Sequence, residues 1–136
     1  MEDENTSLRY AKGMEQLHQQ FGTQRANEMI QGLTQAYPFF AQVNVEFPFA
    51  DIYTRNSVVD LKTREIATVA ALTVQGFSLP ELRIHLIGSL KAGVTREELL
   101  EIITQMIAYA GFPAATNAIL LAKKVFDEID SGELVL

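Results

Sequence analysis

The stretch IATVAALTV at residues 66–74 sets the strongest limit on how this chain can fold. It is rich in alanine and, wound as a helix, is apolar on nearly every side, so we expect it to be buried all round. Asp60 stands before it and can cap a helix that continues to Gln75. No alternating strand pattern competes with helix along the chain, and the sequence therefore predicts an all-α protein.

The N-terminal part predicts two helices and an aromatic connection. Apolar residues recur near the helical period over 7–21, where a polar residue at 5–7 can cap the helix, and a second, weaker helix starts from a cap at Thr23. This second helix must stop near Tyr37, because the residue before a proline disfavours the helical region. Residues 38–57 are aromatic and irregular, and we expect short helices or turns there.

Two capping boxes mark later helix starts. Ser78-x-x-Glu81 and Thr95-x-x-Glu98 both match the pattern in which a hydroxyl and a carboxylate satisfy the unpaired amides at the start of a helix. Glycines end both of the helices that follow, and Pro113 opens the last helix, where its missing amide costs little. We expect about six to seven helices in all.

The length and composition favour one domain that self-associates. The chain has 136 residues, 48% of them hydrophobic, which is enough for a single domain with a substantial core over residues 1–136. Several of the expected helices have more apolar surface than one small bundle needs. We therefore expect the excess to lie between subunits of a homo-oligomer.

The charge and the apolar stretches limit the partners. A formal net charge of −6, with no basic cluster beyond Lys123 and Lys124, gives a field that repels phosphate backbones and anionic lipids. Apolar stretches fall well short of the roughly eighteen residues that span a bilayer, and the start MEDENTSLRY is unlike a secretory signal. We expect a soluble, cytoplasmic protein without nucleic-acid or membrane partners.

The sequence contains no cysteine. Without a thiolate there can be no disulfide, thiol-peroxidase cycle, cysteine nucleophile or soft-metal site. Any chemistry must then be proton transfer or electrostatics. His85, which lies between two strongly apolar helical segments, is the best candidate acid, because an imidazole changes charge near neutral pH.

Three segments together resemble the carboxymuconolactone decarboxylase family, within the wider alkylhydroperoxidase D-like fold group. They are DLKTREIATVAALTVQG at 60–76, ELRIHLIGSLKAGVTREELLEII at 81–103 and YAGFPAATNA at 109–118, in the family's order and spacing. The resemblance covers roughly residues 36–130 as a family-like core, whereas residues 1–35 form N-terminal helices that match no known motif. It implies an all-α, alkylhydroperoxidase D-like helical bundle that assembles into a homo-hexamer, commonly a trimer of dimers, with sites near subunit contacts.

The resemblance separates two kinds of chemistry. The peroxidase branch of the fold group places a CxxC pair just after the glycine that corresponds to Gly76, where this chain reads FSLPELRIH. The decarboxylase branch needs no thiols, and its histidine nine residues after that glycine is matched by His85. That branch removes carbon dioxide from 4-carboxymuconolactone during aromatic compound catabolism, without a cofactor. No metal site is expected.

Two carboxylates are candidates to assist His85. Glu81 lies one helical turn earlier and could orient the ring, although a capping role alone explains it. Glu65 resembles the family's supporting carboxylate, although it could also be part of a solvated first turn. On so apolar a helix it is expected to be paired or else protonated. Counted from the turn, Glu65 and His85 are offset by roughly 7 Å at 1.5 Å per residue, so oblique crossing or a water must close the gap.

An acidic protein needs local cations to bind an anionic substrate. Arg55, Arg64 and Arg83 are the candidates, since a guanidinium binds a carboxylate through two hydrogen bonds. Arg55 is preferred, because it follows the aromatic segment FPFADIYTRN, in which Tyr53 and its neighbours could wall a pocket or simply pack the bundle. Arg83, between two apolar residues, could instead point to water.

These observations predict a cofactor-independent carboxy-lyase that acts on a small carboxylated lactone or keto acid, with His85 as the proton donor. Two alternatives stay open. One is an alkylhydroperoxidase or peroxiredoxin-type activity of the same fold, which the missing thiols disfavour. The other is a non-catalytic oligomeric protein that binds a small acid.

Overall fold

A computed structural model describes residues 4–136, and these residues form helices and connecting turns without a strand, so the predicted all-α class is confirmed. The chain divides into two compact units, Met1–Leu61 and Lys62–Leu136. No helix within the described range has the length and hydropathy that crossing a membrane requires.

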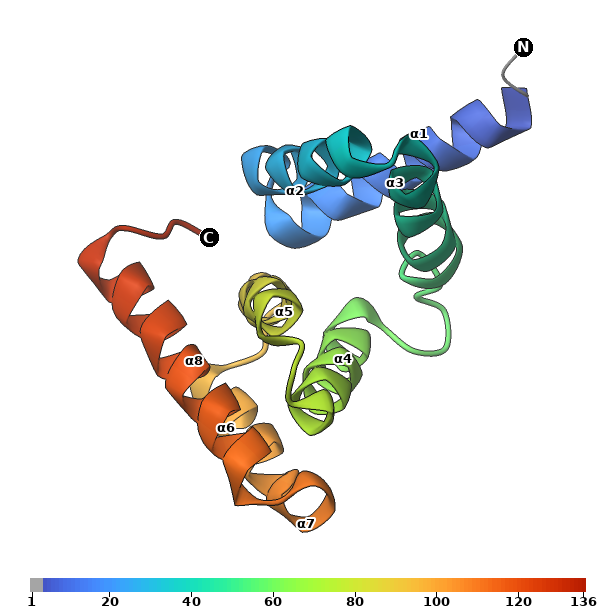
Figure 1. The fold of residues 1–136 in the computed structure, drawn as a ribbon. Coiled ribbons are helices and arrows are strands. Elements are labelled where there is room, and N and C mark those ends of the chain that lie inside the picture. The colour runs from blue at the N-terminus through green and yellow to red at the C-terminus, as the bar shows by residue number, and fades with distance from the viewer. Residues whose placement is uncertain (1–3) are drawn as a thin grey trace. The chain divides into compact units, whose positions relative to one another are not determined.

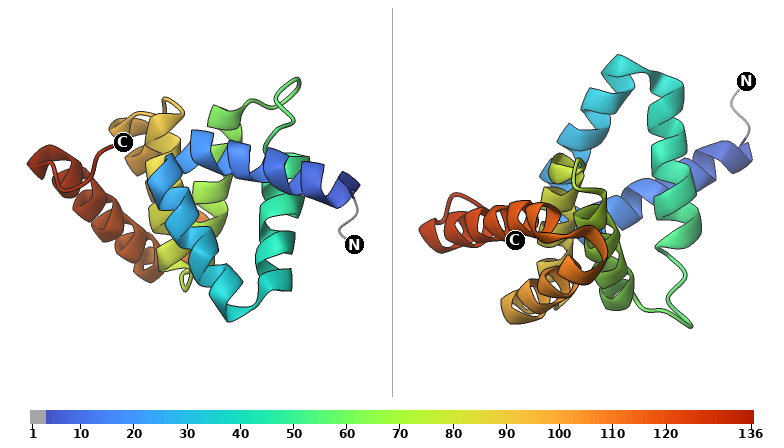
Figure 2. Two further views of the ribbon diagram at one scale, coloured as in Figure 1. Left: turned by 90° about the horizontal axis from the view of Figure 1, so that it is seen from above. Right: turned by 60° about the horizontal axis from the view of Figure 1, so that its bottom comes forward.

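The first unit contains α1 (Glu4–Phe21), α2 (Thr23–Ala36), α3 (Pro38–Asn44) and the π-helical segment η1 (Val45–Ile52). Gly22, at a φ of 89°, joins α1 to α2 in a conformation that other residues rarely adopt. Helices α2 and α3 diverge from Tyr37, where the backbone is extended, and form a V (Figure 2). The short helices expected in the aromatic region are therefore confirmed.

Helix α1 packs closely on η1. Leu17 and Phe21 of α1 are fully buried, and the Phe21 ring meets the ring of Phe49 edge-on, with centroids 5.8 Å apart. Gly13 lets the two backbones approach, since a Cβ at this position would lie 2.3 Å from the carbonyl oxygen of Val45. Glycine is thus required here by the close contact rather than by an unusual backbone angle.

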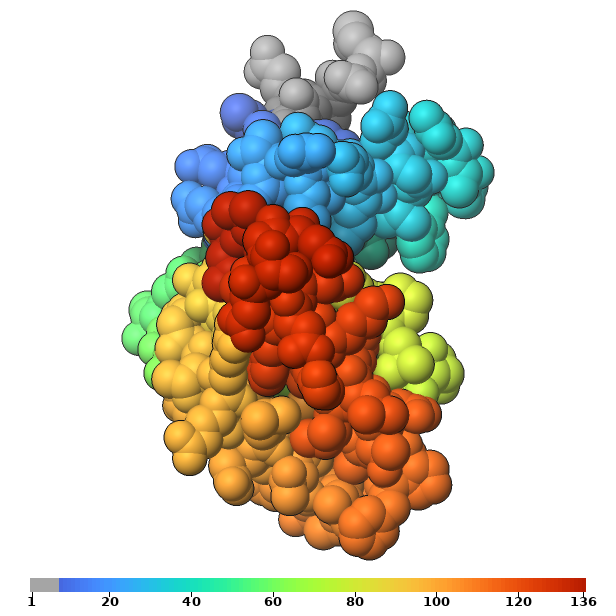
Figure 3. All heavy atoms as spheres, turned by 90° about the vertical axis from the view of Figure 1, so that its left-hand side faces the viewer, coloured from blue at the N-terminus to red at the C-terminus, as the bar shows by residue number. Residues whose placement is uncertain are grey.

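The second unit contains α4 (Leu61–Gln75), α5 (Leu79–Lys91), α6 (Arg96–Gln105), α7 (Ile107–Ala110) and α8 (Phe112–Ser131). Figure 1 shows these helices around α5, and Figure 3 shows α8 running beside α6 with its outer side uncovered. Helix α8 packs on α5, α6 and α7. If α3 with η1, and α6 with α7, are each counted as one interrupted helix, residues 4–136 form seven helices, as the sequence predicts.

The core of the second unit comes from one stripe of each helix. Its fully buried members include Leu82 and Leu86 from α5, Leu99 and Ile103 from α6, and Val125 from α8. Each pair is spaced by four residues, which places both members on one helical face. Burial of apolar side chains of this size stabilises the fold by roughly 1.5–3 kcal/mol each.

Helix α4 is not buried all round, although its apolar sequence predicted that it would be. Glu65, Val69 and Thr73 are buried at four-residue intervals, whereas Ala67, Ala71 and other positions outside this stripe are exposed. A helix can keep small and aliphatic side chains exposed to solvent on its other faces. The apolar count therefore overestimated how much of this helix lies inside the chain.

The predicted capping contact is confirmed at α6 and wrong at three other helices, although α5 does begin directly after Ser78. Helix α2 begins at Thr23, with Gly22 rather than Thr23 in the N-cap position. Helix α1 begins at Glu4, so the cap expected at residues 5–7 lies inside it. The hydroxyl of Ser78 makes no capping bond and instead donates to Oε1 of Gln75 at 2.5 Å. At α6 the capping box is complete, because the hydroxyl of Thr95 accepts from the amide of Glu98, whose carboxylate accepts from the amide of Thr95, both at 3.0 Å.

The Gly13 contact yields a paired stability prediction. Gly13→Ala should lower the free energy of unfolding by about 1–3 kcal/mol, because the new methyl overlaps a backbone carbonyl that cannot simply rotate away. Gly32→Ala, within α2 and with open space around the added methyl, should raise it by about 0.5–1 kcal/mol through helix propensity. Denaturant unfolding of both variants measures the contrast, and equal effects would contradict the close contact.

The α6 capping box yields a pH prediction. Hydrogen bonds from the backbone and side chain of Thr95 hold the pKa of Glu98 below its ordinary value of 4.5. A lowered pKa contributes stability that is present above pH 4.5 and is lost as the pH falls through the folded-state value. Wild type should therefore be more stable than Glu98→Gln at neutral pH, with the difference shrinking in acid. A difference that stays constant down to pH 3 would contradict this origin.

Candidate active site

Glu65 and His85 meet directly between two neighbouring helices of the second unit. Nδ1 of His85 on α5 lies 3.0 Å from Oε2 and 3.4 Å from Oε1 of Glu65 on α4. Helices α4 and α5 cross obliquely (Figure 1), which closes the offset expected from simple counting along the two helices. Contact between Glu65 and His85 needs no bridging water.

The burial of the two side chains is unequal, and this difference defines what the pair can do. The Glu65 side chain is 0% exposed, whereas the His85 side chain is 12% exposed. A carboxylate removed from water is costly unless it is hydrogen-bonded or paired, and His85 supplies such a partner. The predicted pairing of Glu65 is thus confirmed, and the imidazole links this buried group to a position that solvent reaches.

The backbone around His85 is held on several sides. Leu82 and Leu86, which flank it on α5, are fully buried in the core. The buried hydroxyl of Ser89 donates to the carbonyl oxygen of His85 at 2.6 Å. The turn before α5 passes through Gly76, at a φ of 75°, where an added Cβ would lie 3.7 Å from Cβ of Ala114 on α8. These contacts hold the backbone from which the His85 side chain projects.

A carboxylate is an acceptor when ionised, so the pair has a definite direction. With Glu65 ionised, the Nδ1–H of His85 donates to it, which fixes the tautomer and leaves Nε2 on the opposite edge of the ring. An imidazole oriented in this way can hold or deliver a proton at Nε2, while the carboxylate stabilises its positive charge. The chemistry open to this geometry is therefore general acid or base catalysis.

The other candidates of the second unit lie elsewhere on their helices. Glu81 is exposed on the first turn of α5, and the carboxylate that contacts Nδ1 of His85 is that of Glu65. Arg83 does not simply point to water, because its Nη2 donates to Oε2 of Glu128 on α8 at 2.6 Å. Arg64 is partly buried next to Glu65 in sequence, and its carbonyl oxygen accepts from the hydroxyl of Thr68 at 2.9 Å.

The remaining candidates belong to the first unit. The ring of Tyr53 is stacked on that of Phe49, with centroids 5.3 Å apart and an interplanar angle of 14°. Its neighbour Arg55 is exposed in the turn after η1, where its amide donates to the carbonyl oxygen of Ile52. The alternative that the aromatic residues pack the bundle is correct for Phe49, which is 5% exposed, but not for Phe47, which is 59% exposed.

The sequence reasoning missed five side chains whose contacts hold these regions together. Arg9 pairs with Asp51 and with the buried Glu46, and Glu128 binds Arg83. The partners are separated by 37 to 45 residues, so no local pattern could reveal them. Ser89 could have been found, because it lies four residues after His85, the spacing at which a hydroxyl reaches back to a carbonyl.

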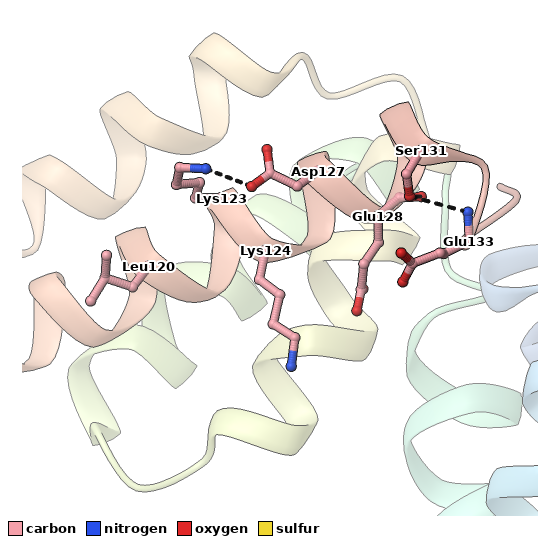
Figure 4. Close-up of a pocket in the computed structure, with 7 residues that line it drawn as sticks. All are labelled: Leu120, Lys123, Lys124, Asp127, Glu128, Ser131 and Glu133. Carbon is pink, nitrogen blue, oxygen red and sulfur yellow. Dashed lines mark hydrogen bonds and ion pairs between the residues drawn. The ribbon is translucent and has the colours of Figure 1, made fainter.

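Two depressions in the second unit lie away from the Glu65–His85 pair. One, of about 410 Å³, lies on α8 and the chain after it, and Figure 4 shows Lys123 bonded to Asp127 at its rim. The other, of about 370 Å³, has Ile66 and Ile102 in its wall and glutamates of α6 at its edge. Within the described part of the chain, no three His, Asp or Glu side chains are grouped so that they could hold a metal ion.

Comparisons with known proteins identify the family of this chain. The model of the carboxymuconolactone decarboxylase family matches residues 38–124, a range that includes both Glu65 and His85. The 4-carboxymuconolactone decarboxylase of Acinetobacter baylyi is 30% identical over 125 residues, which cover 92% of this chain and 92% of that protein. An uncharacterized 15.0 kDa protein of Paracoccus denitrificans, from the nqo9-nqo10 intergenic region, is 38% identical over 87 residues, 63% of this chain and 64% of that protein. This chain therefore belongs to the carboxymuconolactone decarboxylase family.

Proposed function

We propose that this protein is a cofactor-independent carboxy-lyase that decarboxylates a small carboxylated lactone or keto acid, with His85 as the proton donor. The observation that carries the proposal is the direct contact between His85 and the buried Glu65. Family membership and the similarity to a 4-carboxymuconolactone decarboxylase support the reaction type. The absence of cysteine counts against the thiol-dependent peroxidase chemistry of the wider fold group.

The reaction places simple demands on the site. The bond between the carboxylate carbon and its neighbour breaks, carbon dioxide leaves, and the electron pair moves into an adjacent carbonyl to give an enolate. The enolate carbon then takes a proton, which His85 delivers from Nε2 while Glu65 stabilises the charged ring. A positioned acid of this kind typically contributes 10²- to 10⁴-fold to the rate.

Substrate recognition is assigned to cations and an aromatic ring. Arg55 and Arg64 are proposed to bind the substrate carboxylate or lactone oxygens, and Tyr53 to border the binding site. Arg83 contributes less to this proposal, because Glu128 already accepts a hydrogen bond from its guanidinium. Glu81, exposed one turn before His85, is proposed to shape the local field rather than to hold the ring.

Self-association is part of the proposal, with a homo-hexamer as the form that the family resemblance implies. Large apolar side chains lie exposed on the second unit at Phe77, Tyr109, Phe112 and Leu120, each at least 60% exposed. Large apolar side chains left exposed in this way favour contacts between subunits. A cytoplasmic location is proposed with it.

Turnover tests the proposal. With 4-carboxymuconolactone as the first substrate, wild type should release carbon dioxide, and His85→Gln should lose about 10²- to 10⁴-fold in kcat. His18→Gln is the matched control, because His18 pairs with Asn27 on the first unit and has no part in the mechanism. Light scattering on each variant checks that the assembly is unchanged. Binding without carbon dioxide release would support a binding protein instead, and an unchanged rate in His85→Gln would remove His85 from the mechanism.

The ring tautomer tests the assigned direction of the pair. In neutral His85 the proton should reside on Nδ1, because an ionised Glu65 can accept but cannot donate. Glu65→Gln should weaken this preference, since an amide can do either. Long-range nitrogen–proton NMR correlations distinguish the two tautomers, and His18 provides an internal reference. A proton on Nε2 in wild type would contradict the proposed arrangement.

A further inference from the structure

Two carboxylates of the π-helical segment converge on one arginine of α1. Nε of Arg9 donates to Oδ1 of Asp51 at 3.0 Å, and Nη2 of Arg9 bonds to the other oxygen of the same carboxylate. Nη1 of Arg9 lies 3.4 Å from Oε2 of Glu46. Glu46 is 3% exposed, whereas the Arg9 side chain is 47% exposed. We call this group the Arg9 clamp.

The π-helical register is what allows one cation to reach both acids. Glu46 and Asp51 are five residues apart within η1 (Val45–Ile52). In an α-helix such residues point about 140° apart, on nearly opposite sides. In a π-helix, hydrogen bonds join residues five apart, so these residues lie nearly above one another. The Arg9 clamp is therefore specific for the wider register.

The clamp is stronger than an ordinary surface ion pair. An exposed pair formed by single flexible contacts contributes little, but a two-point guanidinium–carboxylate contact within a network is the recognised exception. Removing Arg9 would also leave the buried Glu46 without this cation, which is costlier than losing a surface contact. The hydrogen bond from Arg9 holds the pKa of Asp51 below its ordinary range, so the clamp persists at neutral pH.

Two other contacts join α1 to η1, and each touches η1 at a single residue. Gly13 meets Val45, the first residue of η1, and the ring of Phe21 meets that of Phe49. Arg9 instead reaches from the second residue of η1 to the seventh, across the whole of a π turn. Of these three contacts, the clamp alone spans that turn.

The register of η1 determines where the proposed recognition residues lie. The amide of Tyr53 donates to the carbonyl oxygen of Pro48, five residues earlier, at 2.8 Å. The Tyr53 ring stacks on Phe49, and Arg55 follows two residues later. Return of η1 to the α register would move each later residue by one position, a rotation of about 100° around the helix axis.

We infer that Arg9 is a positioning residue that holds η1 in the π register and thereby fixes where Tyr53 and Arg55 lie within the first unit. The inference rests on the proposed function for the role of Tyr53 and Arg55, but not for the register itself. Arg9 acts through η1 and is not a catalytic residue.

Amide hydrogen exchange tests the register without any substrate. In Arg9→Gln, amides over residues 46–55, including that of Tyr53, should exchange at least tenfold faster, while the second unit is unchanged. Arg9→Lys keeps the charge but loses the two-point contact, so its exchange should also rise, to an intermediate level. Lys12→Gln is the matched control, because Lys12 lies on the same helix and acts on Asp51 through its charge. Exchange over 46–55 that is no faster in Arg9→Gln and Arg9→Lys than in Lys12→Gln would overturn the inference.

Steady-state kinetics with 4-carboxymuconolactone test the consequence. Arg9→Gln should raise KM at least tenfold and lower kcat less than threefold, with partial recovery of KM in Arg9→Lys. If exchange responds but KM does not, positioning of the recognition residues is refuted. If wild type itself does not turn over the lactone, the proposed function fails, and the exchange result still decides whether Arg9 sets the register.

Discussion

The contact between Glu65 and His85 is the interaction on which the proposed chemistry of this protein depends. A fully buried carboxylate is tolerated in a helical core only when another group meets its hydrogen-bonding need, and the imidazole does so from the adjacent helix. Burial of Glu65 on α4 is therefore favourable only while His85 on α5 stays within hydrogen-bonding distance. The fully buried Leu82 and Leu86 anchor α5 in the core on either side of His85.

A second buried carboxylate follows the same physical rule in the first unit. Glu46 is also nearly inaccessible, and its cation is a partly exposed arginine rather than an imidazole. The difference in partner has a chemical meaning, because a guanidinium keeps its proton whereas an imidazole exchanges it near neutral pH. One pair is suited to hold a backbone register, and the other is suited to move a proton.

The local patterns of the sequence predicted much of this fold. The Thr95 capping box, the apolar spacing of α5, α6 and α8, and the nine-residue step from Gly76 to His85 are all properties of short segments. The prediction failed at Ser78, where a neighbouring glutamine side chain competes for the hydroxyl. It also failed for the exposure of α4, because composition does not tell how much of a helix its neighbours cover.

Contacts between distant residues could not be predicted in this way. The pairs Arg9–Asp51 and Arg83–Glu128 join residues 42 and 45 positions apart, and neither has a local sequence signal. We infer the same for the π register of Val45–Ile52, since Arg9 of α1 contacts both Glu46 and Asp51 of that segment. Glu65 and His85, only 20 positions apart on consecutive helices, lie at the limit of what spacing alone can suggest.

The Glu65–His85 pair lies entirely within Lys62–Leu136, whereas Tyr53 and Arg55 belong to Met1–Leu61. Under the proposed function, substitutions in the earlier segment would change which acid is accepted without altering the hydrogen bond between imidazole and carboxylate. Selectivity could then diverge between descendants while the proposed acid–base pair is inherited unchanged.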